Sequence, residues 1–132
     1  MKKHVSKVRV RYGETDQMGV VHHGKYAQYL ELGRIAWLKS YGISYKKLEE
    51  NGVMLPVYEL NIKYLKPAYF DDELLVETTL KEAPRVRISF QYRIENQQNE
   101  VITRAETTLV FMDKKKRKPI FCPPELQTAL AF

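Results

Sequence analysis

A short polar segment of this sequence brings together residue types that can do acyl chemistry. Asp16 lies in it, Gly19 follows three positions later, and His22 and His23 come just before a run with helical periodicity. A carboxylate can activate water or attack a carbonyl. The first N–H groups of a helix can hold an oxyanion, because they have no partner inside the helix. Asp16 is therefore a candidate catalytic group, and the alternative is that it only caps or shapes a turn.

The elements that would position this segment follow from hydrophobic periodicity. Residues 7–12 alternate between apolar and basic side chains, which indicates a half-buried strand. Residues 25–41 repeat apolar side chains at helical spacing over most of the circumference, which predicts one long helix buried on several sides. Gly33 within it predicts a close approach to a sheet. Gly42 is expected to end the helix, and Ser44 to cap a short second one.

After residue 52 the pattern changes to a period of two. Alternating stretches separated by turn signals lie at 58–64, 74–80, 86–94 and 101–112. They predict a meander of four antiparallel strands, with the first strand joining from outside. One buried helix and a curved antiparallel sheet make an α+β fold, which we expect to form a single domain over residues 1–132.

With these elements in view, the polar segment resembles a known family. The motif T-D-x-x-G-x-V-x-H-x-x-Y, which runs from Thr15 to Tyr26, looks like the 4-hydroxybenzoyl-CoA thioesterase family of hotdog-fold proteins. It is especially similar to the branch of small bacterial acyl-CoA thioesterases that includes the one encoded with the Tol-Pal system. The resemblance implies a hotdog fold, in which about five antiparallel strands wrap a long central helix. It also implies hydrolysis of an acyl-CoA thioester to free acid and coenzyme A, without any further cofactor.

The resemblance implies a role for each matching position. Asp16 aligns with the catalytic aspartate, which acts as nucleophile or as base on water. His23 aligns with the helix-start residue whose backbone N–H polarises the thioester carbonyl. Gly19 aligns with the glycine that shapes the loop, and Tyr26 with an aromatic side chain packed behind the site. His22 departs from the Tyr or Trp found in many relatives, so contact with the acyl group, proton transfer and simple packing all stay open for it.

Coenzyme A carries phosphates, and this chain has a formal net charge of +6. Arg87 on the polar face of a predicted strand is a candidate phosphate ligand, and so are Lys114 and Lys116 in the basic run 114–118. The alternative for both is a solvated basic surface. The resemblance further implies a homodimer, often paired into a homotetramer, with the thioester bound between two protomers.

Other classes of function fit the sequence less well. Adjacent His22 and His23 diverge on a helix, and no further His or Cys lies at ligand spacing, so we expect no metal site. No stretch reaches the ~18 apolar residues of a membrane span, and the N-terminus lacks the apolar core of a signal peptide. We therefore expect a cytoplasmic protein. Cys122, the only cysteine, lies beside Pro123 and is a poor candidate for a catalytic thiol. The basic run is accompanied by no nucleic-acid recognition motif.

Two functions other than thioester hydrolysis stay open for this sequence. A hotdog dehydratase or hydratase pairs a histidine with an acid in a different arrangement, and the five residues between Asp16 and His22 argue against it. A module that binds acyl-CoA or acyl-carrier protein without catalysis would share the fold but would not need Asp16.

Overall fold

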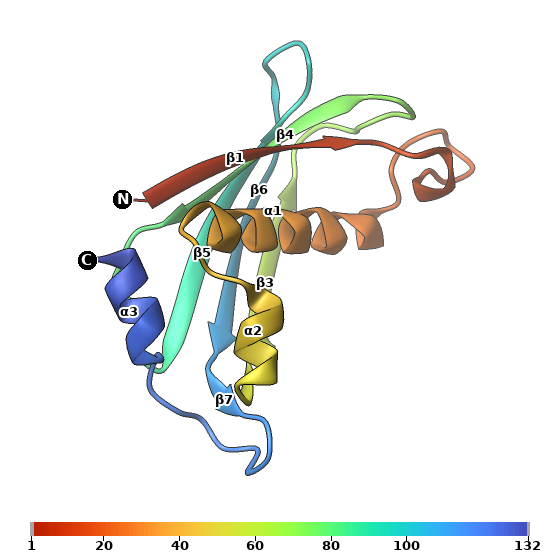
Figure 1. Cartoon of the computed structure of the whole chain (residues 1–132). Helices are drawn as coiled ribbons and strands as arrows, with labels where there is room; N and C mark the ends of the chain where they lie inside the picture. The colour runs from red at the N-terminus through yellow and green to blue at the C-terminus, as the bar shows by residue number, and fades with distance from the viewer. Residues whose placement is uncertain (1, 132) are drawn as a thin grey trace.

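A five-stranded antiparallel sheet curves around helix α1 (Tyr26–Ser40) in the computed structural model, which describes residues 2–131 (Figure 1). The sheet has the spatial order β1-β4-β5-β6-β3, made of β1 (Lys2–Arg9), β3 (Val57–Tyr64), β4 (Glu73–Leu80), β5 (Arg87–Glu95) and β6 (Val101–Val110). The smaller elements are α2 (Tyr45–Glu50), the ribbon of β2 (Val53–Met54) and β7 (Met112–Asp113), α3 (Pro124–Leu130), and 3-10 turns at Tyr12–Glu14 and His23–Lys25. This is the α+β hotdog fold that was predicted.

The order of the strands corrects one expectation. β4, β5 and β6 form a meander, but β3 pairs with β6 and not with β4, so β1 and β3 are the two edges of the sheet. Alternation of side chains identifies the buried face of a strand but not its neighbour. The first strand is also displaced, because it covers Lys2–Arg9 and Tyr12 already belongs to a 3-10 turn.

The helix α1 packs closely on the sheet at Gly33. A Cβ atom at this position would lie 2.7 Å from Oγ1 of Thr78 and 2.9 Å from Cγ1 of Val76, closer than real Cβ contacts. The predicted close approach is confirmed. It explains a residue that costs about 1 kcal/mol of helix propensity relative to alanine.

The other side of α1 leaves apolar side chains uncovered within one chain. Leu32 is 52% exposed and Ile35 is 40% exposed. Strand β3 likewise exposes Val57, Leu60 and Tyr64. The helix was expected to be buried on several sides, and a single chain buries only its sheet-facing side.

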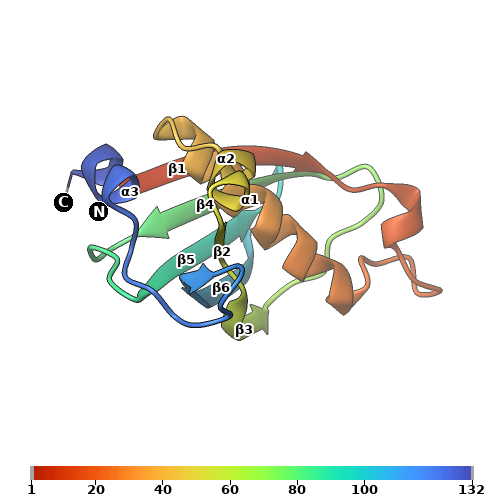
Figure 2. The ribbon, with the colours of Figure 1, turned by 60° about the horizontal axis from the view of Figure 1, so that its bottom comes forward.

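The ends of the helices follow the sequence signals. Gly42 has a φ of 76° just after α1, and the side chain of Ser44 accepts a hydrogen bond from the N–H of Lys47 at the start of α2. Helix α3 was not predicted; it buries Leu126 and Leu130 at the end of the sheet away from the 12–22 loop (Figures 1 and 2). Across residues 2–131, none of the helices has the length and apolar character needed to cross a membrane.

Candidate active site

Asp16 opens a tight turn that ends at Gly19. The N–H of Gly19 donates to the carbonyl of Asp16 over 3.0 Å. Oδ1 of Asp16 accepts from the N–H of Met18 at 2.8 Å and from that of Val20 at 3.4 Å. Gly19 has a φ of +81°, a conformation that favours glycine. The spacing of Asp16 and Gly19 is thus a turn signature in its own right, and Asp16 is a turn former.

The second carboxylate oxygen of Asp16 is not used by this turn. Among the hydrogen bonds of residues 2–131, those accepted by Asp16's side chain all go to Oδ1. The side chain is half-buried in the wall of a pocket of about 300 Å³. The other residues that line this pocket are Met18, Val20, Val21, His23, Tyr26, Tyr64, Leu65, Lys66 and Pro67. One oxygen of Asp16 therefore fixes the loop while the other is free for chemistry.

Backbone pairing holds the turn against the connection between β3 and β4. Thr15 pairs with Val21 and Val20 pairs with Tyr69, each as an isolated antiparallel bridge. The N–H of Val21 donates to the carbonyl of Ala68 over 2.9 Å. The Asp16 turn is therefore anchored on both sides rather than left as a free loop.

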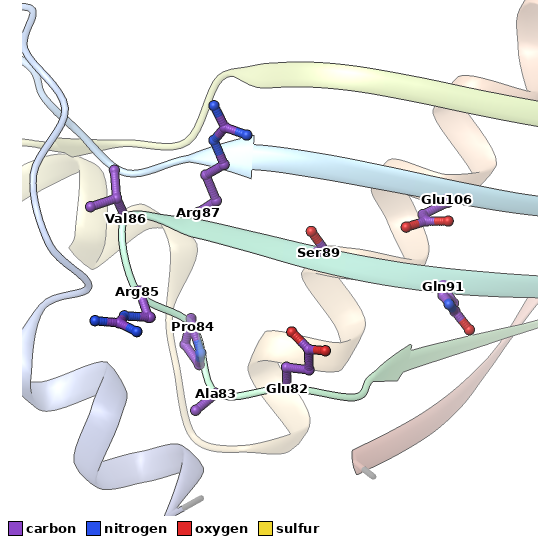
Figure 3. A pocket seen from close by; sticks show the side chains of 9 residues that line it. All are labelled: Glu82, Ala83, Pro84, Arg85, Val86, Arg87, Ser89, Gln91 and Glu106. Atoms are coloured by element: carbon purple, nitrogen blue, oxygen red, sulfur yellow. The ribbon is translucent and has the colours of Figure 1, made fainter.

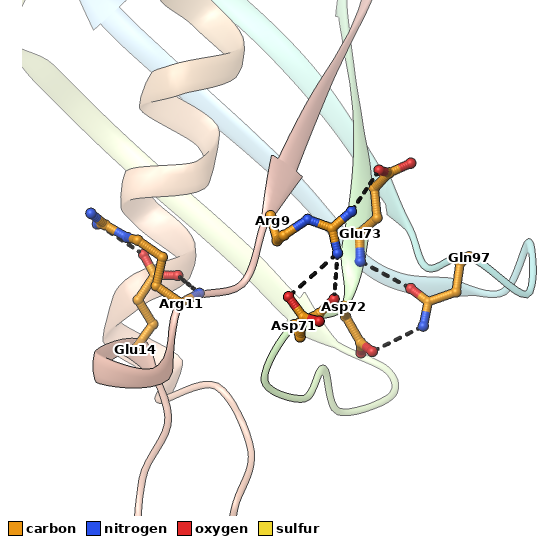
Figure 4. A network of polar contacts seen from close by, with 7 residues as sticks. All are labelled: Arg9, Arg11, Glu14, Asp71, Asp72, Glu73 and Gln97. Atoms are coloured by element: carbon orange, nitrogen blue, oxygen red, sulfur yellow. Dashed lines mark hydrogen bonds and ion pairs between the residues drawn. The ribbon is translucent and has the colours of Figure 1, made fainter.

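The connection itself is fixed by a polar network at its far end (Figure 4). Arg9 donates to the carbonyl of Asp71 at 2.8 Å and to the carboxylate of Glu73 at 3.1 Å. Gln97 accepts from the N–H of Glu73 and donates to the side chain of Asp72. These contacts fix the end of the connection that leads into β4, outside the lining of the Asp16 pocket.

His22 caps the turn that leads into α1. Its Nδ1 accepts a hydrogen bond from the N–H of Gly24 at 3.0 Å. The ring nitrogen thus takes the place of a helix-capping oxygen at the start of the 3-10 turn. Its ring stacks on that of His23, with 4.3 Å between the centroids. His22 does not line the Asp16 pocket, and capping is the role that its contacts describe.

The backbone N–H of His23, at the start of the helix, has no hydrogen-bond acceptor within residues 2–131. The N–H of His22 donates to the carbonyl of Glu14, and that of Gly24 is bonded to His22. Within residues 2–131, none of the hydrogen bonds uses the N–H of His23. His23 begins the 3-10 turn that continues into α1, where the partial positive charge of the helix N-terminus lies. Because His23 also lines the Asp16 pocket, its N–H is a candidate donor to a negative charge that forms there.

Tyr64 joins the site from the end of β3, although it was not among the site residues predicted from the sequence. Its hydroxyl donates to the carbonyl of His23 at 3.0 Å. Its ring packs edge-on against Tyr26, with 5.1 Å between the centroids. Tyr26 is 3% exposed, and burial raises the pKa of its phenol, so it forms a neutral wall. Tyr64 resembles any aromatic residue of an alternating strand, which is why no sequence signal distinguished it.

The sequence as a whole matches a known superfamily of proteins. The family model of the thioesterase-like superfamily matches residues 10–130. The chain belongs to this superfamily. The predicted thioesterase family is thus confirmed.

Individual relatives of this thioesterase-like chain cover most of its length. YneP of Bacillus subtilis is 38% identical over 119 residues, which are 89% of this chain and 86% of that protein. The acyl-CoA thioester hydrolase YbgC of Escherichia coli O157:H7 is 32% identical over 119 residues, which are 90% of this chain and 89% of that protein. The crystal structure of a DHNA-CoA thioesterase from Staphylococcus aureus matches with a TM-score of 0.95 and 31% identity, over 99% of this chain and 90% of that one.

The three candidate phosphate ligands of this thioesterase-like chain lie outside the Asp16 pocket. The guanidinium of Arg87 lies 4.4 Å from the centre of the Tyr58 ring and lines a separate, open pocket of about 490 Å³ (Figure 3). Lys114 and Lys116 lie in the turn after β7, where the N–H of Lys116 donates to Oδ1 of Asp113 at 2.8 Å. One chain alone does not bring these cations to the acid and the helix N-terminus.

Cys122 and the histidines offer no competing chemistry in the described part of the chain. Cys122 is 1% exposed, and burial raises the pKa of its thiol to about 11, so it stays protonated. Residues 2–131 contain no group of three or more His, Cys, Asp or Glu side chains that could hold a metal ion.

Proposed function

We propose that the protein hydrolyses acyl-CoA thioesters in the pocket that Asp16 and the N–H of His23 share. One observation carries the proposal: Asp16 and His23 line the same pocket, and each has a group free of hydrogen bonds among residues 2–131, a carboxylate oxygen on Asp16 and the backbone N–H on His23. The family match and the hydrolase activity in the name of YbgC support this class of reaction.

The proposed chemistry needs only these two groups and water. The thioester carbonyl oxygen accepts the N–H of His23, and a donor of this kind contributes about 2.7–4 kcal/mol to the transition state. Asp16 takes a proton from water as the water oxygen adds to the carbonyl carbon. The C–S bond then breaks, and the leaving thiolate takes the proton from Asp16. In the alternative route the carboxylate attacks the carbonyl itself and the thiolate leaves as the mixed anhydride forms. Water then hydrolyses the anhydride to the free acid and the Asp16 carboxylate, and the proton that this releases goes to the thiolate.

The free edge of β3 supports a homodimer. This strand ends the sheet on one side, and Val57, Leu60 and Tyr64 are exposed along it. An exposed apolar edge is a template for pairing with another chain. A two-fold axis through the middle of β3 would pair two such edges antiparallel, which sets the Val57 end of one protomer beside the Tyr64 end of the other.

This arrangement supports a role for the basic residues in holding the coenzyme. Arg87 lies over Tyr58, next to Val57, so a protomer paired in this way presents Arg87 toward the Tyr64 end of its partner. Guanidinium groups bind phosphates through charge-assisted hydrogen bonds. Lys114 and Lys116 follow β6 toward the same end and would add to the positive potential. Pairing into a tetramer and a cytoplasmic location stay predictions.

The test is release of free thiol from a panel of acyl-CoA thioesters. Asp16→Asn keeps an oxygen that can accept from Met18 but removes the base, so kcat should fall by about 10²–10⁴-fold. Asp71→Asn is the matched control, because this exposed acid has a φ of 67°, which asparagine tolerates. It should keep wild-type activity.

Four results would contradict the proposal. Unchanged hydrolysis by Asp16→Asn would remove Asp16 from the mechanism. Release of thiol from an acyl-carrier-protein thioester but from no acyl-CoA would show that the carrier-protein thioester is the substrate. No release from either would favour a binding module. Hydration of crotonyl-CoA without hydrolysis would favour a hydratase.

A further inference from the structure

We propose that Glu14 is a positioning residue, which holds the Asp16 turn in a fixed place relative to the start of helix α1. This inference rests on the proposed function, because the groups that Glu14 aligns are the base and the oxyanion donor named there.

The carboxylate of Glu14 joins the entry of the turn to the helix. Glu14 is 7% exposed and lies two residues before Asp16. Its Oε1 accepts from the N–H of Arg11 at 2.8 Å and from the hydroxyl of Tyr29 at 2.9 Å, and its Oε2 accepts from the guanidinium of Arg11 at 3.3 Å. Figure 4 shows the pair of Arg11 and Glu14 at the base of α1. Tyr29 belongs to α1 and is 1% exposed, so one carboxylate bonds two segments that are distant in sequence.

The backbone of Glu14 makes a second connection to the same place. Its carbonyl accepts the N–H of His22 at 2.9 Å. His22 immediately precedes His23, whose N–H is the proposed oxyanion donor. Asp16 is therefore tied to the helix start through the main chain of Glu14, and to the first turns of α1 through its side chain.

Packing alone does not account for an acid at this position. A buried charge is costly unless it is paired and hydrogen-bonded, and an apolar side chain would fill the same volume without that cost. Burial raises the pKa of Glu14, but the Arg11 N–H, the Tyr29 hydroxyl and the Arg11 guanidinium outweigh it and hold the pKa below its ordinary value. Burial and the neighbouring Glu14 raise the pKa of Tyr29. The carboxylate thus stays charged and the phenol stays protonated, which is the state that makes this hydrogen bond.

A charge-assisted hydrogen bond fixes the relative orientation of the two groups it joins more strongly than an apolar contact does. The placement of Asp16 relative to the His23 N–H matters because a displacement of about 1 Å at a catalytic site can cost about 10²-fold in rate. Loss of the hydrogen bonds that Glu14 accepts is therefore expected to lower kcat even in variants that stay folded.

The test compares variants that keep or remove the acceptor. Tyr29→Phe retains the buried ring and removes only the hydroxyl, and kcat should fall about tenfold while KM changes by less than about twofold. Glu14→Met has a similar length without an acceptor and should lose at least as much. Glu14→Gln keeps an oxygen for both Arg11 and Tyr29 and should restore most of kcat. If Glu14→Met fails to fold, Tyr29→Phe still decides the question.

A matched control separates positioning from stability. Ser44→Ala removes a capping hydrogen bond from α2, outside the Asp16 pocket, so it should lower Tm and leave kcat unchanged. In the double variant with Asp16→Asn, Tyr29→Phe should cause a much smaller further loss, because the base that it helps to align is already absent.

Two outcomes would overturn the inference. One is wild-type kcat in folded Tyr29→Phe, and the other is a loss of kcat in Ser44→Ala that matches that of Tyr29→Phe at equal Tm. Unchanged hydrolysis in Asp16→Asn is a different result, since it would refute the proposed function before Glu14 is considered.

Discussion

The hydroxyl of Tyr64 donates a hydrogen bond to the backbone carbonyl of His23, 3.0 Å away. The contact ties the last residue of the edge strand β3 to the first residue of the turn that leads into α1. The Tyr64 ring also packs against Tyr26, which lies on α1. The edge strand and the helix N-terminus therefore hold each other in place where both line the Asp16 pocket.

Tyr64→Phe should lower kcat about fivefold, because it removes one hydrogen bond of about 1 kcal/mol and keeps the ring contacts. Steady-state thiol release measures the change. Tyr12→Phe is the control, since Tyr12 is 76% exposed and its hydroxyl makes none of the hydrogen bonds found among residues 2–131. Equal kcat for Tyr64→Phe and wild type would show that this contact does not align His23.

The parts of the fold that depend on local pattern could be predicted from the sequence. The apolar run at residues 25–41 predicted α1 to within one residue at each end, because helical periodicity is a local signal. Asp16 was expected to cap or shape a turn if it was not catalytic, and it does shape one; Gly33 predicted close packing on the sheet. Each of these inferences needed only residues near in sequence.

The parts that depend on distant contacts could not be predicted. Strand β3 pairs with β6, which is far from it in sequence. The alternation of side chains within β3 carries no information about which strand will be its neighbour. Glu14 was not predicted as a site residue for a similar reason. Its partner Tyr29 lies 15 residues away, and the two side chains come together only because of the way the turn is oriented against the helix. In a polar stretch, a buried acid has the same sequence signature as an exposed one.

If two chains pair along β3, a charge placed on this edge should separate them. Leu60→Lys puts a charge in the middle of this edge, where it would be buried between two protomers, so the variant should sediment as a monomer and lose most activity. Val5→Lys is the control on the opposite edge, where Val5 is 50% exposed, and it should leave the oligomeric state unchanged. Sedimentation velocity measures both. A dimer that persists in Leu60→Lys would place the interface elsewhere.

The coenzyme proposal predicts a substrate-dependent effect of Arg87→Ala. Loss of a charge-assisted hydrogen bond to phosphate, worth about 1.5–3 kcal/mol, should raise KM for an acyl-CoA by at least about tenfold. The KM for the matching acyl-pantetheine, which lacks the nucleotide, should not change. Arg93→Ala is the control, since Arg93 lies on the same strand and pairs with Glu95 at 2.7 Å. An equal rise in KM for both substrates would argue against phosphate binding.

Cys122 should not react with a thiol reagent in the native protein at pH 8. The reactive form is the thiolate, and burial raises the thiol pKa from its ordinary 9.0 to about 11. The folded state thus holds this proton more tightly than the unfolded chain, so the thiol's contribution to stability is complete below about pH 9 and is lost as pH rises toward 11. Absorbance after addition of an aromatic disulfide, with and without urea, measures the reaction. Rapid labelling without urea would show that the C-terminal segment opens readily.

Gly33→Ala should destabilise the fold because the helix has no room to move away from the sheet. The added Cβ would meet Thr78 and Val76 at 2.7 Å and 2.9 Å, and both neighbours belong to the central part of β4. Overpacking of this kind costs about 1–3 kcal/mol, more than the gain in helix propensity of about 1 kcal/mol that alanine brings. Gly13→Ala is the matched control, since nothing lies within 4 Å of its Cβ position. Urea unfolding followed by tryptophan fluorescence measures both variants through Trp37, which is fully buried on the same helix. Equal stability of the two variants would mean that α1 can shift away from β4, and the helix N-terminus would then be less firmly placed opposite Asp16 than its packing indicates.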